Sequence, residues 1–176
     1  MMITRACQLC CRVTWVLLVV ACSGTSRQSS GAERPADAMS DRDGVTLERG
    51  RCRGGCTPYR VTLQDDGRVV FALLDAKTQR VDSVDPVAVS TLLDAMRSGG
   101  FNALDTAYVH GAGSCGDYAM DAPVGVLTLR GAGRTHSVRY DHGCAALPRA
   151  LFRWSMAADS IARTQRWLPS STGVSR

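Results

Sequence analysis

Eight cysteines carry the clearest chemical information in this 176-residue chain. Three lie before or within an N-terminal apolar region, one directly follows it, and four lie farther along: Cys7, Cys10 and Cys11; Cys22; and Cys52, Cys56, Cys115 and Cys144. Four cysteines in a mature domain suit two disulfides in an oxidising compartment. Three pairings are possible, and Cys52–Cys56 with Cys115–Cys144 is the simplest.

The Cys52/Cys56 pair occupies a corner between two extended segments, with Gly54 and Gly55 between the cysteines. Glycine provides the backbone freedom that so small a disulfide loop needs. The alternative is a soft-metal site for copper or zinc, because thiolates bind Cu(I) well. In envelope copper chaperones with thioredoxin folds a helix follows such cysteines. A strand pattern follows them here, so we expect a disulfide and no cofactor.

A group of His and Asp residues surrounds the second cysteine pair. A Cys115–Cys144 bond would draw His110, Asp117 and Asp121 of a long loop, together with Tyr118, towards two residues at the end of a hairpin, Asp141 and His142. Such a group could hold a metal or act in acid–base chemistry. Its spacing matches no metal or hydrolase motif, and the chain has no G-x-S-x-G, H-E-x-x-H, Walker or dinucleotide motif. We therefore favour a disulfide-held surface loop over a catalytic site, and assign no catalytic residue and no metal ligand.

The N-terminus has the pattern of a secretory signal. Arg5 and Arg12 precede an apolar run over residues 13–21, which is too short to span a bilayer and suits a signal peptide. Val19-Val20-Ala21-Cys22 resembles the bacterial lipobox. This resemblance implies that residues 1–21 are removed and that Cys22 carries acyl chains such as palmitate. Ser23, in place of Asp, favours the outer membrane, at its periplasmic face or the cell surface.

Charge and motif content restrict the partners. The formal net charge is +5, and no basic stripe with interleaved aromatic residues is present, so nucleic acid is not expected. We expect contact with the membrane through the lipid anchor, and with another envelope protein. The sequence therefore predicts a lipid-anchored cell-envelope module that binds or scaffolds. The alternative is a small envelope enzyme or a copper- or zinc-binding protein that uses residues 105–144 or the Cys52/Cys56 pair.

Composition predicts a flexible tether over residues 22–43, one domain over 44–168 and a disordered tail over 169–176. Alternating apolar residues and turn signals predict extended segments over residues 45–49, 59–64, 68–73, 78–84, 124–129 and 134–140. Apolar residues at helical spacing predict helices after Asp85-Pro86 and from Leu147. Residues 102–122 fit no regular pattern. The expected fold is α+β, an antiparallel sheet of five to six strands with two helices on one face, in the order β-β-β-α-β-β-α.

The corner also resembles a known family. Cys52, Gly54, Cys56 and Tyr59 match the C-x-G-x-C-P-x-Y motif of a family of bacterial envelope proteins, domain of unknown function 6438, although Thr57 here separates Cys56 from Pro58. Tyr108 and the Asp121-x-Pro123 step are also similar, and the likeness covers about residues 44–166. It implies a small secreted or lipid-anchored α+β domain, and brings no established activity.

Overall fold

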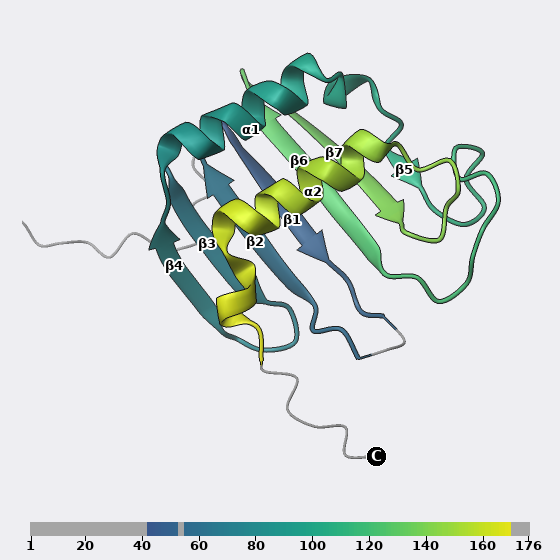
Figure 1. Ribbon diagram of the computed structural model, residues 1–176, viewed down its shortest axis with the longest axis horizontal. Coiled ribbons are helices and arrows are strands. Elements are labelled where there is room, and N and C mark those ends of the chain that lie inside the picture. The colour runs from purple at the N-terminus through teal and green to yellow at the C-terminus, as the bar shows by residue number, and fades with distance from the viewer. Residues whose placement is uncertain (1–41, 53–54, 170–176) are drawn as a thin grey trace, which may run out of the picture. The chain divides into compact units, whose positions relative to one another are not determined.

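The computed structural model describes residues 42–52 and 55–169, which form a sheet with two helices packed against one face (Figure 1). The predicted signal peptide, Cys22, nearly all of the predicted tether and residues 170–176 lie outside the described part. None of the helices in that part is both long enough and apolar enough to cross a membrane.

The sheet has seven strands in the order β4-β3-β2-β1-β6-β7-β5. They are β1 (Gly44–Arg49), β2 (Tyr59–Gln64), β3 (Arg68–Leu73), β4 (Gln79–Ser83), β5 (Ala107–Tyr108), β6 (Val124–Gly131) and β7 (Arg134–Asp141). Every neighbouring pair is antiparallel except β5 and β7. The α+β class is confirmed, but the sheet is larger than predicted and is mixed. The additional strand is β5, two residues that pair in parallel with β7, too short to leave a sequence pattern.

The first strand lies at the centre of the sheet. β1 pairs with β2 on one side and with β6 on the other, so that Leu47 faces both Val61 and Leu127. All three side chains are buried. Because successive strand residues point to opposite faces, this register places one apolar row under the helices and sends the alternate residues to the other face.

Helix α1 (Pro86–Ser98) begins where the sequence predicts. The Asp85 carboxylate accepts a hydrogen bond from the backbone N–H of Val87, and Pro86 occupies the first turn. Four apolar side chains at helical spacing are buried: Val89, Leu92, Leu93 and Met96. At the end of the helix, a Cβ on Gly99 would lie 2.5 Å from the Trp154 ring, so glycine allows the second helix to approach closely.

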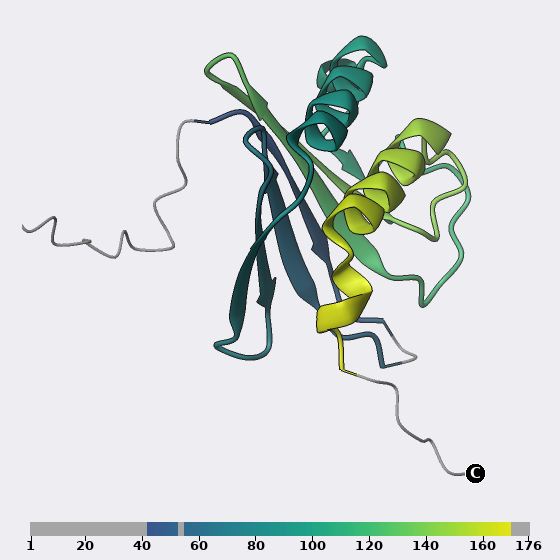
Figure 2. The same ribbon diagram turned by 60° about the vertical axis from the view of Figure 1, so that its left-hand side comes forward.

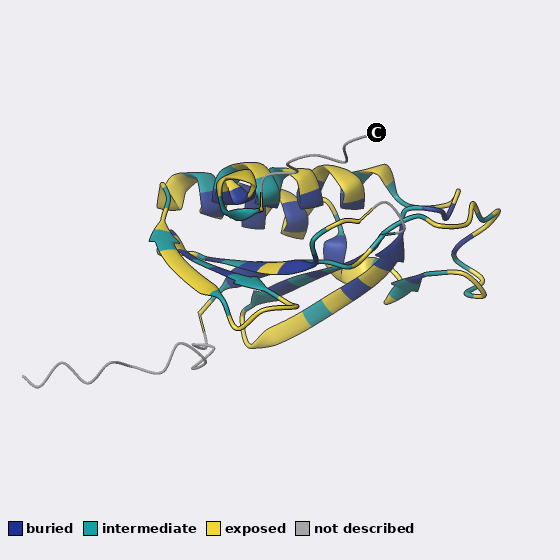
Figure 3. Ribbon diagram, turned by 90° about the horizontal axis from the view of Figure 1, so that it is seen from below, coloured by how far each residue is buried: buried dark blue, intermediate teal, exposed yellow. Residues whose placement is uncertain are grey.

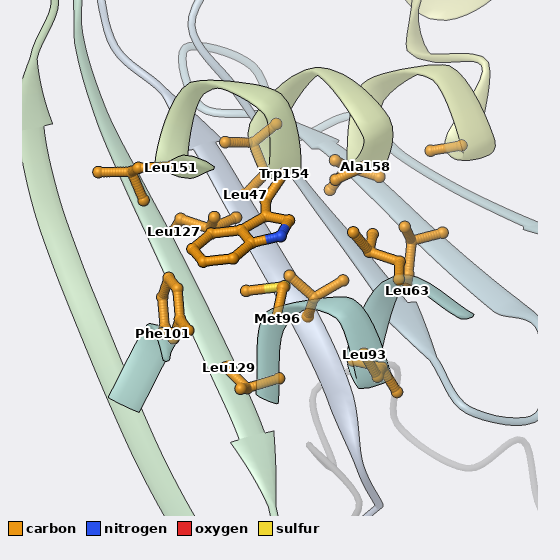
Figure 4. Close-up of a cluster of buried hydrophobic side chains, with 14 of the residues drawn as sticks. Leu47, Leu63, Leu93, Met96, Phe101, Leu127, Leu129, Leu151, Trp154 and Ala158 are labelled. Atoms are coloured by element: carbon orange, nitrogen blue, oxygen red, sulfur yellow. The ribbon is translucent and has the colours of Figure 1, made fainter. Parts of the chain in front are cut away.

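Helix α2 (Arg149–Ala162) begins two residues after Leu147, because Pro148 occupies its N-cap position. It ends at Arg163, whose φ of 53° is left-handed. Leu151, Trp154 and Ala158 face the sheet, and Figure 4 shows the Trp154 ring lying over side chains from the sheet and from α1. Complete burial of one such large apolar side chain contributes about 1.5–3 kcal/mol to folding.

The other face of the sheet has no helix across it (Figures 2 and 3). Its middle row follows from the registers and runs Val81, Val70, Thr62, Thr46, Thr128 and Ser137. Hydroxyl groups of neighbouring strands bond across it, at 3.0 Å for Thr46–Thr62 and 2.8 Å for Thr128–Ser137. Antiparallel sheets commonly leave one face to solvent. We call this surface the open face.

Candidate functional site

The glycine-containing corner is closed as the sequence predicts. Cys52 and Cys56 form a disulfide with a Cα–Cα distance of 5.2 Å. Cys56 is exposed, and Gly55 has a φ of 84°. The disulfide leaves no free thiolate at this pair, so a soft-metal site here would require its reduction.

A polar network lies at the base of the corner, on the helix side of the sheet. Arg49, the last residue of β1, donates from Nε and Nη2 to Oδ2 of Asp159, at 3.2 and 2.9 Å. The Tyr59 hydroxyl donates to Oδ1 of Asp159 at 2.6 Å, and Thr164 donates to the same oxygen at 3.1 Å. The residues on either side of the corner are thus joined to one carboxylate on α2.

The network continues to β7 through the same guanidinium. Nη1 of Arg49 lies 3.3 Å from the Tyr140 hydroxyl and 3.2 Å from Nε2 of His142. The Tyr140 hydroxyl also bonds the hydroxyl of Ser155 at 2.8 Å. Tyr140 fits here because its partner across the strands is Gly125, where a Cβ would lie 2.6 Å from the ring.

Burial, together with neighbouring groups, sets the protonation of two members of this network. Burial and the hydrogen bond to Asp159 raise the pKa of Tyr59 to about 12, so the hydroxyl stays a donor. Burial, followed by the nearby Arg49 charge, lowers the pKa of His142. Since a guanidinium can only donate, Nε2 of the neutral imidazole accepts from Arg49.

These contacts satisfy the network internally. The Arg49 and Asp159 side chains are only 17% and 15% exposed. Across residues 42–52 and 55–169, every buried side-chain nitrogen or oxygen has a hydrogen-bond partner. Because the His142 lone pair is engaged with Arg49, the imidazole is not free to act as a base. The arrangement fixes α2 against the ends of β1, β2 and β7.

Of the residues in this network, the predicted polar cluster contained only His142. Tyr59 was identified only as a residue of the family motif, and Arg49 and Asp159 were missed. One signal was available for Arg49. It follows Val45 and Leu47 at intervals of two, so that strand alternation sends its charge towards the core. A charge in that position requires a buried partner. Nothing in the local sequence identifies that partner as Asp159, because it lies 110 residues away.

The long loop is attached to the hairpin end as predicted. Cys115 and Cys144 form a disulfide with a Cα–Cα distance of 4.7 Å, and both are buried. The Tyr118 hydroxyl donates to Oδ2 of Asp141 at 3.0 Å, and the His110 ring lies 4.4 Å from the Tyr118 ring. Hydrogen bonding to Asp141 raises the pKa of Tyr118. The loop therefore covers Asp141, which is only 5% exposed.

The predicted polar cluster is divided by the end of β7. Asp141 faces the loop, whereas His142 faces Arg49 and the exposed Phe152 ring. Asp117 is exposed, and the exposed Asp121 has a φ of 71°, as expected of a turn residue. Within the described ranges no group of three or more His, Cys, Asp or Glu side chains is arranged to hold a metal.

A hollow of about 410 Å³ lies elsewhere, between the end of α1 and the β6–β7 hairpin. Its lining comprises Arg97, Asn102, Leu129, Gly131, Ala132 and Arg134. Arg97 binds the carboxylates of Asp43 and Asp94 at 2.6 and 3.0 Å. None of the five predicted cluster residues lines this hollow.

Comparison with known protein families gives a match over most of the described domain. No curated protein matches this sequence. The family model described as domain of unknown function (DUF6438) matches residues 43–162, which is more than half of the chain and contains the corner, both disulfides and the Arg49–Asp159 network. The chain is a member of the DUF6438 family.

Proposed function

We propose that this protein is a lipid-anchored module of the bacterial cell envelope, attached through Cys22, and that it acts by binding. The observation that carries the proposal is the pair of disulfides in one small domain. Disulfides persist in oxidising compartments and are rare in the cytosol. They agree with the apolar run and the lipobox-like Val19-Val20-Ala21-Cys22, which indicate export and lipidation.

The geometry supports binding over catalysis. The polar side chains most suited to chemistry, Arg49, Asp159 and His142, are occupied by one another. They hold a helix on the sheet, and the fold then presents the open face to its surroundings. The partners we propose are the membrane, through the anchor, and a second envelope protein.

Metabolic labelling with a fatty-acid probe tests the anchor. The wild-type chain should incorporate the probe, and Cys22→Ala should not. Cys7→Ala is the matched control, because it removes a cysteine that processing discards, and should label like the wild type. Equal labelling of Cys22→Ala and wild type would disprove the anchor.

Peptide mapping under non-reducing conditions tests the competing soft-metal function. Protein isolated from the envelope should give linked Cys52–Cys56 and Cys115–Cys144 peptides without prior oxidation. Free thiols with stoichiometric copper or zinc would instead favour the metal-binding alternative.

A further inference from the structure

The open face carries an excess of positive charge. Strand alternation and register place four arginines on it, one on each of four strands: Arg60 (β2), Arg68 (β3), Arg130 (β6) and Arg139 (β7). Glu48 on β1 has the same orientation, and it pairs with Arg60 at 2.9 Å. Asp141 also has this orientation, but the loop around Tyr118 covers it.

Three of these arginines have no acidic partner in the part of the chain that the structure describes. Within residues 42–52 and 55–169, the side chains of Arg68, Arg130 and Arg139 form no ion pair. The β2–β3 turn adds Asp65 and Asp66 at one end of the face, and Asp66 is paired with Arg42 at 2.9 Å. Three guanidinium groups thus remain available to an external anion.

The rest of the face suits a broad, shallow contact. Between the arginines lie hydroxyl groups and small apolar side chains: Thr46, Thr62, Thr128, Ser137, Val70, Ala72 and Val126. Along the strands, Arg60 lies four positions from Gln64, which is in the same row as Arg130. Across the sheet, four strand spacings separate Arg68 on β3 from Arg139 on β7. At about 3.3 Å per residue and 4.8 Å per strand, the four arginines span roughly 13 Å along the strands and roughly 19 Å across them. Such spacing matches an array of anionic groups rather than one small anion.

The position at which the chain enters the sheet indicates which array of anionic groups the open face contacts. The described part begins at Arg42 and leads directly into β1, the central strand of this sheet. If Cys22 is lipidated, about twenty residues separate the membrane from this strand, and a chain of that length reaches at most about 70 Å even when fully extended. The anchor would therefore hold the open face at high effective concentration near lipid headgroups.

We propose that the open face docks on the membrane surface by binding the phosphates of anionic lipids, an inference that rests on the proposed lipid anchor. Guanidinium groups bind phosphate in bidentate geometry, and each basic residue near an anionic surface strengthens binding about fivefold. Docking would turn α1 and α2 away from the bilayer. The helix surface, with the exposed Phe152 and Met156, is then available to a protein partner.

Vesicle co-sedimentation tests the docking in the absence of the covalent lipid anchor. The protein is the mature polypeptide, residues 22–176 with Cys22→Ser, which includes every described residue. Vesicles are phosphatidylcholine alone, or phosphatidylcholine with phosphatidylglycerol. The wild-type face should bind only the anionic vesicles, and 0.5 M salt should abolish binding because it screens exposed charges.

Two triple variants that each lose three positive charges distinguish binding by the open face from a general attraction of the protein to anionic vesicles. Arg68→Gln/Arg130→Gln/Arg139→Gln should weaken binding by about a hundredfold. Arg134→Gln/Arg149→Gln/Arg153→Gln, which removes exposed charges on the helix side, should weaken it less than about fivefold. If a triple variant does not fold, a second pair of variants replaces it: Ser137→Glu on the open face and the control Ser90→Glu on α1. Only Ser137→Glu should lose binding.

Equal losses in the two triple variants, or absence of wild-type binding to anionic vesicles, would overturn the docking proposal. Preferential binding to a soluble acidic polysaccharide, with dextran sulfate as the probe, would also overturn it and identify a glycan face. The labelling experiment on Cys22 is independent of these results. Labelling without vesicle binding disproves only the docking, whereas vesicle binding without labelling disproves only the anchor.

Discussion

The two disulfides close segments that the rest of the fold supports very differently. Cys52–Cys56 joins cysteines four positions apart in a corner whose ends are already fixed, because Arg49 and Tyr59 are paired across β1 and β2 and both bind Asp159. Cys115–Cys144 spans 29 residues of sequence, is buried, and attaches a loop with little regular structure to the end of β7. A disulfide restricts a chain most where hydrogen bonds and packing restrict it least.

Removal of the long-range disulfide should have the largest effect. In Cys115→Ala/Cys144→Ala we expect the free energy of unfolding to fall by about 3–4 kcal/mol, because the unfolded chain regains the entropy of a 29-residue loop. Thermal unfolding of residues 22–176 with Cys22→Ser, monitored by circular dichroism, measures this loss of stability. A melting temperature within a degree or two of the parent would show that the loop is held without its disulfide.

Removal of the Asp159 carboxylate should have the second largest effect on stability. Asp159→Ala leaves the partly buried Arg49 and the Tyr59 hydroxyl without their acceptor, and we expect a loss of about 2–3 kcal/mol in urea unfolding. The matched control is Asp94→Ala on α1. Its carboxylate also pairs with an arginine but is 76% exposed, so we expect less than about 0.5 kcal/mol. Similar losses in the two variants would show that the Asp159 network contributes little.

Removal of the Cys52–Cys56 disulfide should lower the free energy of unfolding less than removal of Cys115–Cys144 or of the Asp159 carboxylate. The entropy of its short loop corresponds to about 2 kcal/mol, and the paired strand ends reduce this further. We therefore expect Cys52→Ala/Cys56→Ala to melt above Cys115→Ala/Cys144→Ala. In the Asp159→Ala background, where the independent support is lost, removal of the corner disulfide should cost more than it does in the parent. Additive losses would show that Asp159 and the corner are uncoupled.

Protonation of His142 should give the smallest effect. Its pKa is lowered in the folded protein, so between that value and about 6.5 the unfolded chain binds more protons. Its contribution to stability is therefore complete above pH 6.5 and is lost as the pH falls towards the folded pKa. Urea unfolding at pH 7.5 and 5.5 should show a larger decline for wild type than for His142→Gln. Equal declines would exclude a link between this imidazole and Arg49.

Most of the fold could be predicted because its signals are local. Strand alternation gives β2 and β3 their bounds, and Asp85-Pro86 marks the start of α1. The missing information is long-range. β5 has only two residues and exists because the loop returns along β7, where the Cys115–Cys144 bond holds it. No local preference could indicate a parallel pair of that length.

The candidate site was less predictable for the same reason. Clustering of His and Asp in the sequence suggested one group, but strand alternation sends Asp141 and His142 to opposite sides of β7. The network that does form joins Arg49 to Asp159, and its carboxylate comes from a helix far along the chain. Asp141 and His142 are adjacent in sequence but bind different partners, whereas Arg49 and Asp159 bind each other although 110 residues separate them.

The central position of the first strand also affects how the chain can fold. β1 is completed only when Gly44 pairs with Arg130 and Arg49 with Gly125, near the far end of the domain. Pairing over such long sequence separation is slow, since a large loop must close first. Until β6 has been synthesised, β1 presents an unpaired edge beside the apolar Val45 and Leu47, a template for aggregation. We expect the newly made chain to depend on a holding chaperone until its sixth strand is available.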